Sequence, residues 1–213
     1  MLLRMSPEQP ARKRDGAATR EAILASAVTE FTEHGYARAG VRQIAERAGV
    51  TAMMINRYFG SKERLFAEVV DRVFAPPTVV GDRLPGLADS VARTLAERTA
   101  PDAERLDPFL LLLRSASDPE AADIVRRGIE THVGTRLAGL LEGSDAEVRA
   151  QLGLALLAGT WLLRSIVGTT ALAEADNDHL AGLIADMLRP VTQETGRTGI
   201  AHRSVGGPAD SAE

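Results

Sequence analysis

Residues 41–62 read VRQIAERAGVTAMMINRYFGSK, and they carry the clearest local structural signals in the chain. Its first half has the apolar spacing i, i+3, i+4, i+7 of an amphipathic helix, carried by Val41, Ile44, Ala45 and Ala48. Gly49 ends that helix because glycine tolerates positive φ, and Thr51 is a suitable N-cap for a second helix. Two short helices joined by a tight glycine-containing turn predict a helix-turn-helix, whose second helix fits the DNA major groove.

The second helix presents unusual side chains on its outer face. At 100° per residue, Ile55 and Phe59 fall on the side that the domain buries. The opposite face carries Met53, Met54 and Arg57, with Tyr58 on one flank and Asn56 on the other. A helix kept only for packing would place Glu, Lys or Gln there. Methionine can pack on thymine methyls, and arginine can fork onto guanine or clamp a phosphate. The face is therefore predicted to bind double-stranded DNA.

Lys62 is the first candidate for a phosphate contact. Ser61 is predicted to cap the next helix, which places Lys62 in its first turn, where a cation opposes the helix dipole by about 0.3–1 kcal/mol. Together with the free backbone N–H groups of that turn, the Lys62 ammonium could bind a DNA phosphate. The alternative is an ordinary solvated lysine without a DNA contact. The predicted DNA contacts are Arg42, Thr51, Met53, Met54, Asn56, Arg57, Tyr58 and Lys62.

The sequence around this motif has a wider pattern. It comprises Ile23, Leu24, Ala27, Phe31, Gly35 and Tyr36, then Ile44, Ala45, Ala48, Gly49 and Val50, and finally Tyr58, Phe59, Ser61, Lys62, Glu63 and Leu65. With this pattern, residues 19–70 resemble the DNA-binding domain of the TetR (tetracycline-repressor-like) family of transcriptional regulators. The resemblance implies a homodimer that binds a palindromic operator, usually as a repressor, and that releases it when a small molecule fills the C-terminal domain.

Two positions depart from the family pattern. The chain has Ala39-Gly40 where the family often has Thr-Ser at the start of the first helix of the motif. Gly40 can still serve as N-cap with Gln43 at N3, but a hydroxyl that could touch phosphate is lost. Asn56 stands where the family commonly carries a tyrosine. Because Asn can donate to phosphate or pair with adenine, we expect the contact at this position to be altered but not lost.

Composition predicts an all-α protein of 213 residues, 45% hydrophobic and 4% aromatic, with abundant Ala and Leu. The chain has no cysteine, which excludes disulfides and thiolate chemistry. The net charge of −4 is divided unevenly: residues 1–70 hold 11 Lys/Arg and 8 Asp/Glu, whereas residues 71–213 hold 14 and 21. The N-terminal part can therefore meet phosphate while the acidic remainder stays clear of it.

The predicted architecture is an N-terminal three-helix helix-turn-helix domain joined by a linking helix to a C-terminal helical ligand-binding and dimerisation domain. Residues 1–18 are predicted to be a disordered basic arm, either a DNA contact or a solubilising tail. Residues 19–74 form the DNA-binding domain, with Thr19 capping its first helix, Gly35 ending it and the linking helix at 62–74. Residues 75–190 form the second domain, with helices predicted at 86–99, 107–116, 118–142, 145–173 and 177–190. Residues 191–213 are predicted to be a flexible tail.

The penultimate helix is apolar in nearly every direction between Leu152 and Val167, with Arg164 as its only charge. A helix that is hydrophobic all round must be covered on all sides, so a second subunit is expected on one of them. A core helix within one chain is the alternative. A membrane span is disfavoured because Arg164 lies well inside the segment. The predicted dimer interface contains Leu152, Leu156, Gly159, Leu163 and Ile166.

A ligand pocket for an unidentified small, largely apolar molecule is expected between the C-terminal helices. Its predicted residues are Phe109, Leu112, Leu113, Leu137 and Trp161, with Arg114 or His132 as a polar anchor. Each of these residues could equally be part of a filled core.

Enzymatic motifs are missing from the sequence. Its four histidines, His34, His132, His179 and His202, are widely separated, and no metal-binding, nucleophile or phosphate-loop motif is present. We therefore expect no catalysis, metal or cofactor, and a cytoplasmic protein without a signal peptide. The alternatives to an inducible repressor are a DNA-binding regulator or architectural protein without a small-molecule trigger and a helical protein–protein adaptor.

Overall fold

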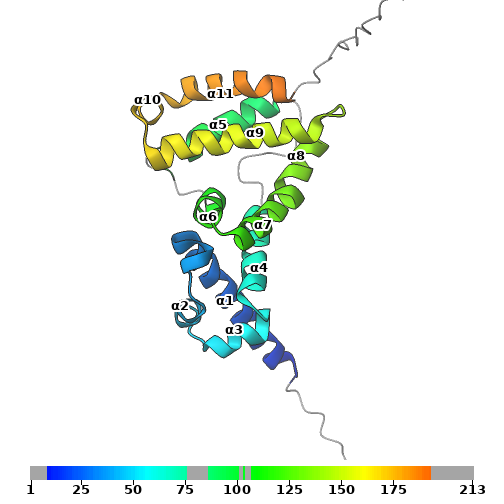
Figure 1. Cartoon of the computed structure of the whole chain (residues 1–213), viewed down its shortest axis with the longest axis vertical. Helices are drawn as coiled ribbons and strands as arrows, with labels where there is room; N and C mark the ends of the chain where they lie inside the picture. Colours follow the sequence, from blue (N-terminus) through cyan, green and yellow to red (C-terminus); the bar gives the residue numbers. More distant parts are fainter. Residues whose placement is uncertain (1–8, 76–85, 101–102, 104–106, 193–213) are drawn as a thin grey trace, which may run out of the picture.

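The computed structural model describes residues 9–75, 86–100, 103 and 107–192, and all regular structure in these ranges is helical. Figure 1 shows two tiers: α1–α4 form the lower one, and α5, α9 and α11 cross the upper one. Helices α6 and α7 lie between the tiers, and α8 continues from α7 towards the upper tier. The predicted all-α fold with two helical parts is confirmed.

The lower tier contains the helix-turn-helix. Its helices are α1 (Gln9–Arg38), α2 (Val41–Arg47), α3 (Ala52–Phe59) and α4 (Lys62–Phe74). One side chain from each helix, Phe31, Ile44, Ile55 and Phe66, is fully buried in a shared core. Phe31 and Phe66 meet edge to face with 5.0 Å between ring centroids, which is a favourable aromatic geometry. The apolar spacing in the sequence therefore identified the inward side of each helix.

Helix α1 begins earlier than the sequence analysis predicted. It starts at Gln9, and Thr19 lies inside it, where its hydroxyl donates to the Asp15 carbonyl at 2.8 Å. The Thr19 cap and the disordered arm are therefore wrong for residues 9–18, because the Ala- and Arg-rich segment before Thr19 favours helix. The predicted arm at residues 1–8 lies outside the described residues. The break at Gly35 is confirmed, with φ +72°.

The upper tier and its connections contain the remaining elements. These are α5 (Leu87–Arg98), α6 (Asp107–Ser115), α7 (Pro119–Gly128), η1 (Ile129–Gly134), α8 (Thr135–Gly139), α9 (Ala146–Trp161), η2 (Leu162–Val167), α10 (Thr170–Ala173) and α11 (Asn177–Thr192). All five predicted helices are present, with two differences. The segment predicted as one helix over 118–142 contains the π-helical turn η1, and the segment at 145–173 breaks at Gly168, where φ is +68°. The predicted tail beyond residue 192 lies outside the described residues.

Arg164 shows how the long apolar helix is anchored. The segment Ala146–Val167 is long and apolar enough to cross a membrane by length and composition alone. Arg164 within it is only 4% exposed and donates to the Ala96 carbonyl at 2.8 Å and to Asn177 Oδ1 at 2.7 Å. Burial lowers the pKa of this guanidinium. It caps the C-terminal end of α5 and ties it to the start of α11, as expected of a helix packed within a protein.

Direct polar contacts join the lower tier to the helices that lie between it and the upper tier. The Arg114 guanidinium of α6 donates to the Thr32 carbonyl at 2.6 Å and to the Glu33 carbonyl at 2.8 Å, both on α1. On the other side, His132 Nε2 of η1 lies 2.8 Å from Asp71 Oδ1 of α4. Arg136 of α8 donates to the carbonyl of Ala75, which follows α4. The C-terminal helices therefore contact both α1 and the linking helix.

Candidate nucleic-acid interface

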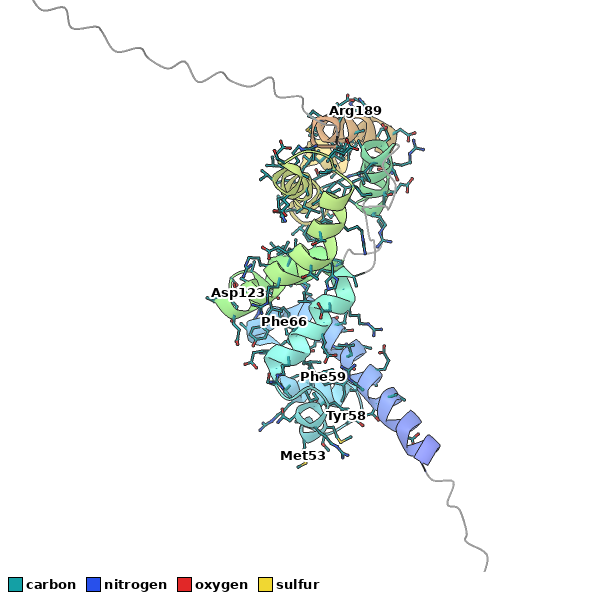
Figure 2. The ribbon with its side chains drawn as sticks, turned by 90° about the vertical axis from the view of Figure 1, so that its right-hand side faces the viewer. Met53, Tyr58, Phe59, Phe66, Asp123 and Arg189 are labelled. Carbon is teal, nitrogen blue, oxygen red and sulfur yellow. The ribbon has the colours of Figure 1, made fainter. Side chains whose placement is uncertain are left out.

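The turn before α3 fixes the direction of that helix. Gly49 has φ +67°, which glycine adopts without strain, and the Val50 N–H donates to the Ala45 carbonyl at 2.9 Å. Thr51 occupies the N-cap in extended conformation, although its side chain makes no capping hydrogen bond. Helix α3 lies in the part of the lower tier that points away from the upper tier, beside the first turns of α1, with Met53 projecting away from the protein (Figure 2).

The outer face of α3 is bare, as the sequence predicted. Met53 is 79% exposed, and Asn56 and Arg57 are also exposed. Tyr58 is half-buried and packs against the lower core at the flank of this face. Met54, which was predicted to face outward, is also half-buried against that core, so the bare surface consists of Met53, Asn56 and Arg57. Exposed methionine and arginine on an eight-residue helix at a molecular end give a surface that can enter a major groove.

The structure assigns Lys62 a contact that the sequence did not indicate. Ser61 caps α4 as predicted, because its Oγ accepts from the Arg64 N–H at 3.2 Å. The Lys62 ammonium lies 4.6 Å from the centroid of the Tyr36 ring, a cation–π contact between α4 and the end of α1. Burial lowers the pKa of Lys62, and the nearby carboxylates of Asp118 and Glu120 oppose that shift. Its phosphate contact stays a prediction.

Tyr36 links the DNA-binding helices to α7. Its hydroxyl donates to Glu120 Oε2 at 3.0 Å, and its backbone N–H donates to Ser115 Oγ at 3.3 Å. Burial raises the pKa of the phenol, and the hydrogen bond to Glu120 raises it further, because both favour the neutral form. The Gly35-Tyr36 pair was visible in the sequence, but Glu120 lies 84 residues away, and no spacing rule connects them.

Two further details of the motif were partly visible. Gly40 is the N-cap of α2, as predicted. A Cβ at Gly40 would overlap Gln43 Oε1, because the Gln43 side chain folds back over the cap. Arg20 of α1, which the sequence analysis did not single out, lies 4.8 Å from the centroid of the Phe59 ring and pairs with Glu68. It therefore braces the last residue of α3 against α1 and α4.

A groove of about 1060 Å³ opens between α6, α7, η1, α8 and the start of α9; we call it the α7–α9 groove. Its apolar lining includes Leu112, Ala122, Val125, Ile129, Ala138 and Val148. Among the predicted pocket residues, only Leu112 lines it. Helix α7 and η1 contribute six of the other thirteen residues, which were missed because 118–142 was interpreted as one continuous helix.

The other predicted pocket residues lie elsewhere. Phe109 and Trp161 stack on each other in the upper core with 5.1 Å between centroids, and Leu137 is buried there. Leu113 is exposed on α6. Arg114 and His132, proposed as polar anchors, instead join the lower tier to the helices above it. Any contact between these residues and a ligand stays a prediction.

The predicted dimer residues lie on an exposed apolar surface. We call this surface the α9–α11 face; its exposed members are Leu152, Leu163, Ile166, Val167, Leu183 and Met187. Leu156 and Gly159 are half-buried on the same helix, and a Cβ at Gly159 would meet no atom within 4 Å. The chain therefore leaves a large part of its most apolar helix uncovered.

One cluster in the lower tier has metal-ligand composition. Single ligand atoms of Glu30, Glu33 and His34 lie within 4.8 Å of one another. Arg47 already supplies positive charge there, with its guanidinium 3.6 Å from Glu30 and 3.2 Å from Glu33. The cluster is therefore explained as an ion-pair network that joins α1 to α2.

The geometry described above defines a helix-turn-helix protein, and comparison with known proteins identifies its family. A protein-family model described as "Bacterial regulatory proteins, tetR family" matches residues 23–69 of the chain. A second family model, described as "Tetracyclin repressor-like, C-terminal domain", matches residues 86–191. The chain belongs to the TetR family of regulators.

Individual relatives agree with this assignment. The HTH-type transcriptional repressor SCO4008 of Streptomyces coelicolor is 41% identical over 59 residues, 28% of this chain and 31% of that protein. The match therefore spans less than a third of this curated relative. The TetR-family regulator SCO0857 of the same species has a similar fold, at 24% identity and TM-score 0.51, covering 88% of this chain and 99% of that one. The multidrug binding protein EbrR, solved with proflavin, gives 18% identity and TM-score 0.56, covering 81% and 99%.

Proposed function

We propose that this protein is a transcriptional repressor that binds a palindromic operator as a homodimer and is released by a small molecule. The observation that carries the proposal is the bare outer face of α3, where Met53 and Arg57 stand free at the end of the molecule. Arg57 and its neighbours would contact bases, and Lys62 would contact a phosphate after leaving Tyr36. Such a protein works in the cytoplasm, where its operator lies.

The α9–α11 face supports the homodimer. An apolar surface of this kind on a soluble subunit marks an interaction site. A two-fold contact in which α9 and α11 pack against the same helices of the second subunit would cover it. Two copies of α3 then face successive major grooves, and the operator acquires the two-fold symmetry of the protein.

The α7–α9 groove supports release by a small molecule. A groove of about 1060 Å³ with mainly aliphatic walls is large enough for a drug-sized ligand. EbrR, which shares the fold, has been solved with proflavin, so a helical framework of this kind can hold a small molecule. Because η1 lines the groove and also contacts α4, a ligand there can alter the position of the linking helix.

Footprinting on the DNA upstream of the protein's own gene tests this function. We expect a protected palindrome and an affinity that falls steeply with salt, because binding releases counterions from the phosphates. Lys62→Ala should weaken binding to every operator variant alike and make the salt dependence shallower by about one phosphate contact. Arg93→Ala, which removes an exposed cation from α5, is the control. A protein that protects no DNA at low salt would be the helical adaptor instead.

A further inference from the structure

The α7–α9 groove has a distinctive wall chemistry. Its apolar lining is aliphatic, with Val125 buried at its base and Ile129 and Val148 nearer the solvent. Such walls favour a flexible hydrocarbon body, since burial of its surface is driven by area without a directional requirement. The walls therefore favour a ligand with a large apolar surface, and any preference for the charge of that ligand must come from the polar groups of the groove.

The charges of the lining are unbalanced. Its ionisable residues are Arg126, Glu130 and Glu147. The Arg126 guanidinium is already held by Glu130 at 3.1 Å and by Asp123 at 3.1 Å, and these hydrogen bonds raise the pKa of Arg126. Among the described residues, no cationic side chain pairs with Glu147. Glu147 lies exposed in the first turn of α9, so the groove offers one carboxylate without a cationic side-chain partner beside its aliphatic walls.

The position of η1 connects this groove to DNA binding. Residues 129 and 130 of η1 line the groove, whereas His132 two residues later contacts Asp71 on α4. The π-helical turn is wider than an α-helical turn, and such turns often occur at functional sites. The six-residue segment η1 therefore both lines the groove and contacts the linking helix α4.

We propose that the α7–α9 groove binds an amphipathic cation, with its hydrocarbon body against the aliphatic walls and its cationic group at Glu147. This inference rests on the proposed function, because the same groove is the site of the releasing ligand. An anion of the same size would be repelled by Glu147, and the Arg126 guanidinium, which already pairs with Glu130 and Asp123, would not be free to bind it. An ammonium on an alkyl chain gains both the apolar burial and the ion pair.

Three probes with one alkyl chain separate charge from hydrophobicity. Isothermal titration calorimetry would compare decyltrimethylammonium, decyl sulfate and the neutral decyl maltoside, all below their micellar concentrations. We expect the cation to bind at least about tenfold more tightly than the anion, with the neutral probe between them. Equal affinities, or tighter binding of decyl sulfate, would overturn the proposal.

Matched variants locate the charge preference. Glu147→Gln should weaken binding of decyltrimethylammonium about fivefold and leave decyl maltoside unchanged, because only the ion pair is lost. Glu174→Gln removes an exposed carboxylate outside the groove and should change neither affinity. Ala116→Trp, at an exposed groove position, should abolish binding of all three probes, with circular dichroism reporting an intact fold. A cation preference that survives Glu147→Gln or Ala116→Trp contradicts this site.

A third measurement separates this inference from the proposed function. The footprinted operator, in the presence of decyltrimethylammonium, should be released by the wild type and retained by Ala116→Trp. Operator binding without any cation preference would refute the groove proposal and leave the regulator standing. A cation preference without operator binding would refute the proposed function and leave the groove standing.

Discussion

Gly128 of α7 lies directly against Val70 of α4, so that a Cβ added to Gly128 would overlap Val70 Cγ1. Val70 is 1% exposed and β-branched, so its side chain is restricted by its χ1 preference and by the surrounding core. The two helices therefore touch without a gap where the C-terminal part meets the linking helix. A shift of α7 would be transmitted to α4 by contact alone.

Gly128→Ala should force α7 and α4 apart. We expect a loss of about 1–3 kcal/mol in the free energy of unfolding, because overpacking a tight contact displaces its neighbours. Operator affinity should change as well, because α4 is the helix that links the DNA-binding domain to the C-terminal part. Gly139→Ala is the control, since an added Cβ there meets no atom within 4 Å and should stabilise by about 0.4–1 kcal/mol. Urea denaturation and operator titration of both variants check this; equal stabilities would show that the contact is loose.

Tyr36 should resist ionisation. The chain has two tyrosines, so in Tyr58→Phe the phenolate absorbance near 295 nm reports Tyr36 alone. Its raised pKa means that folding disfavours the phenolate, so this contribution to stability is complete below about pH 10 and is lost as the pH rises above it. We expect phenolate to appear only well above pH 10, together with loss of helical circular dichroism. Ionisation near pH 10 in folded protein would contradict the buried contact with Glu120.

Arg57→Ala and Met53→Ala should change which bases the protein prefers. Loss of a base contact is expected to cost about 1–3 kcal/mol at one operator position and little elsewhere. Binding to a library of single-base operator variants measures this, with Arg93→Ala as the control for loss of a remote cation. A loss that is uniform across the library would instead identify both side chains as backbone contacts.

Leu163→Glu should separate the subunits. Leu163 and Leu113 are each 43% exposed, but only Leu163 belongs to the α9–α11 face. A charge placed in the centre of an apolar contact is costly to desolvate, so the variant should sediment as a monomer and lose operator affinity. Leu113→Glu, with the same chemistry and exposure on α6, should remain dimeric. Dimers in both variants, or monomers in both, would place the interface elsewhere.

Arg164→Ala should destabilise the upper tier. It leaves the Ala96 carbonyl and Asn177 Oδ1 without their buried donor, at a cost of at least about 2 kcal/mol. The exposed Arg93→Ala should stay within about 0.5 kcal/mol of the wild type. Thermal denaturation compares them, and an unchanged midpoint for Arg164→Ala would mean that water replaces the guanidinium.

The helices that are specified by neighbouring residues could be predicted from the sequence alone. Helical spacing, the glycine at 49 and the cap at Ser61 placed α2, α3 and the start of α4, and the same spacing showed that Met53 and Arg57 face outward. The apolar run of α9 indicated the surface that one subunit leaves uncovered. Local helix propensity was underestimated once, at the start of α1, where Ala and Arg continue the helix before Thr19.

The contacts between distant segments became visible only in the tertiary structure. Lys62 meets Tyr36, Tyr36 meets Glu120, and His132 meets Asp71 because α6, α7 and η1 pack on α1 and α4, and no periodicity encodes these pairs. The groove likewise lies between segments that are far apart in the sequence, from Leu112 on α6 to Gln151 on α9. Secondary structure follows from neighbours along the chain, whereas a site between helices depends on how their surfaces fit in space.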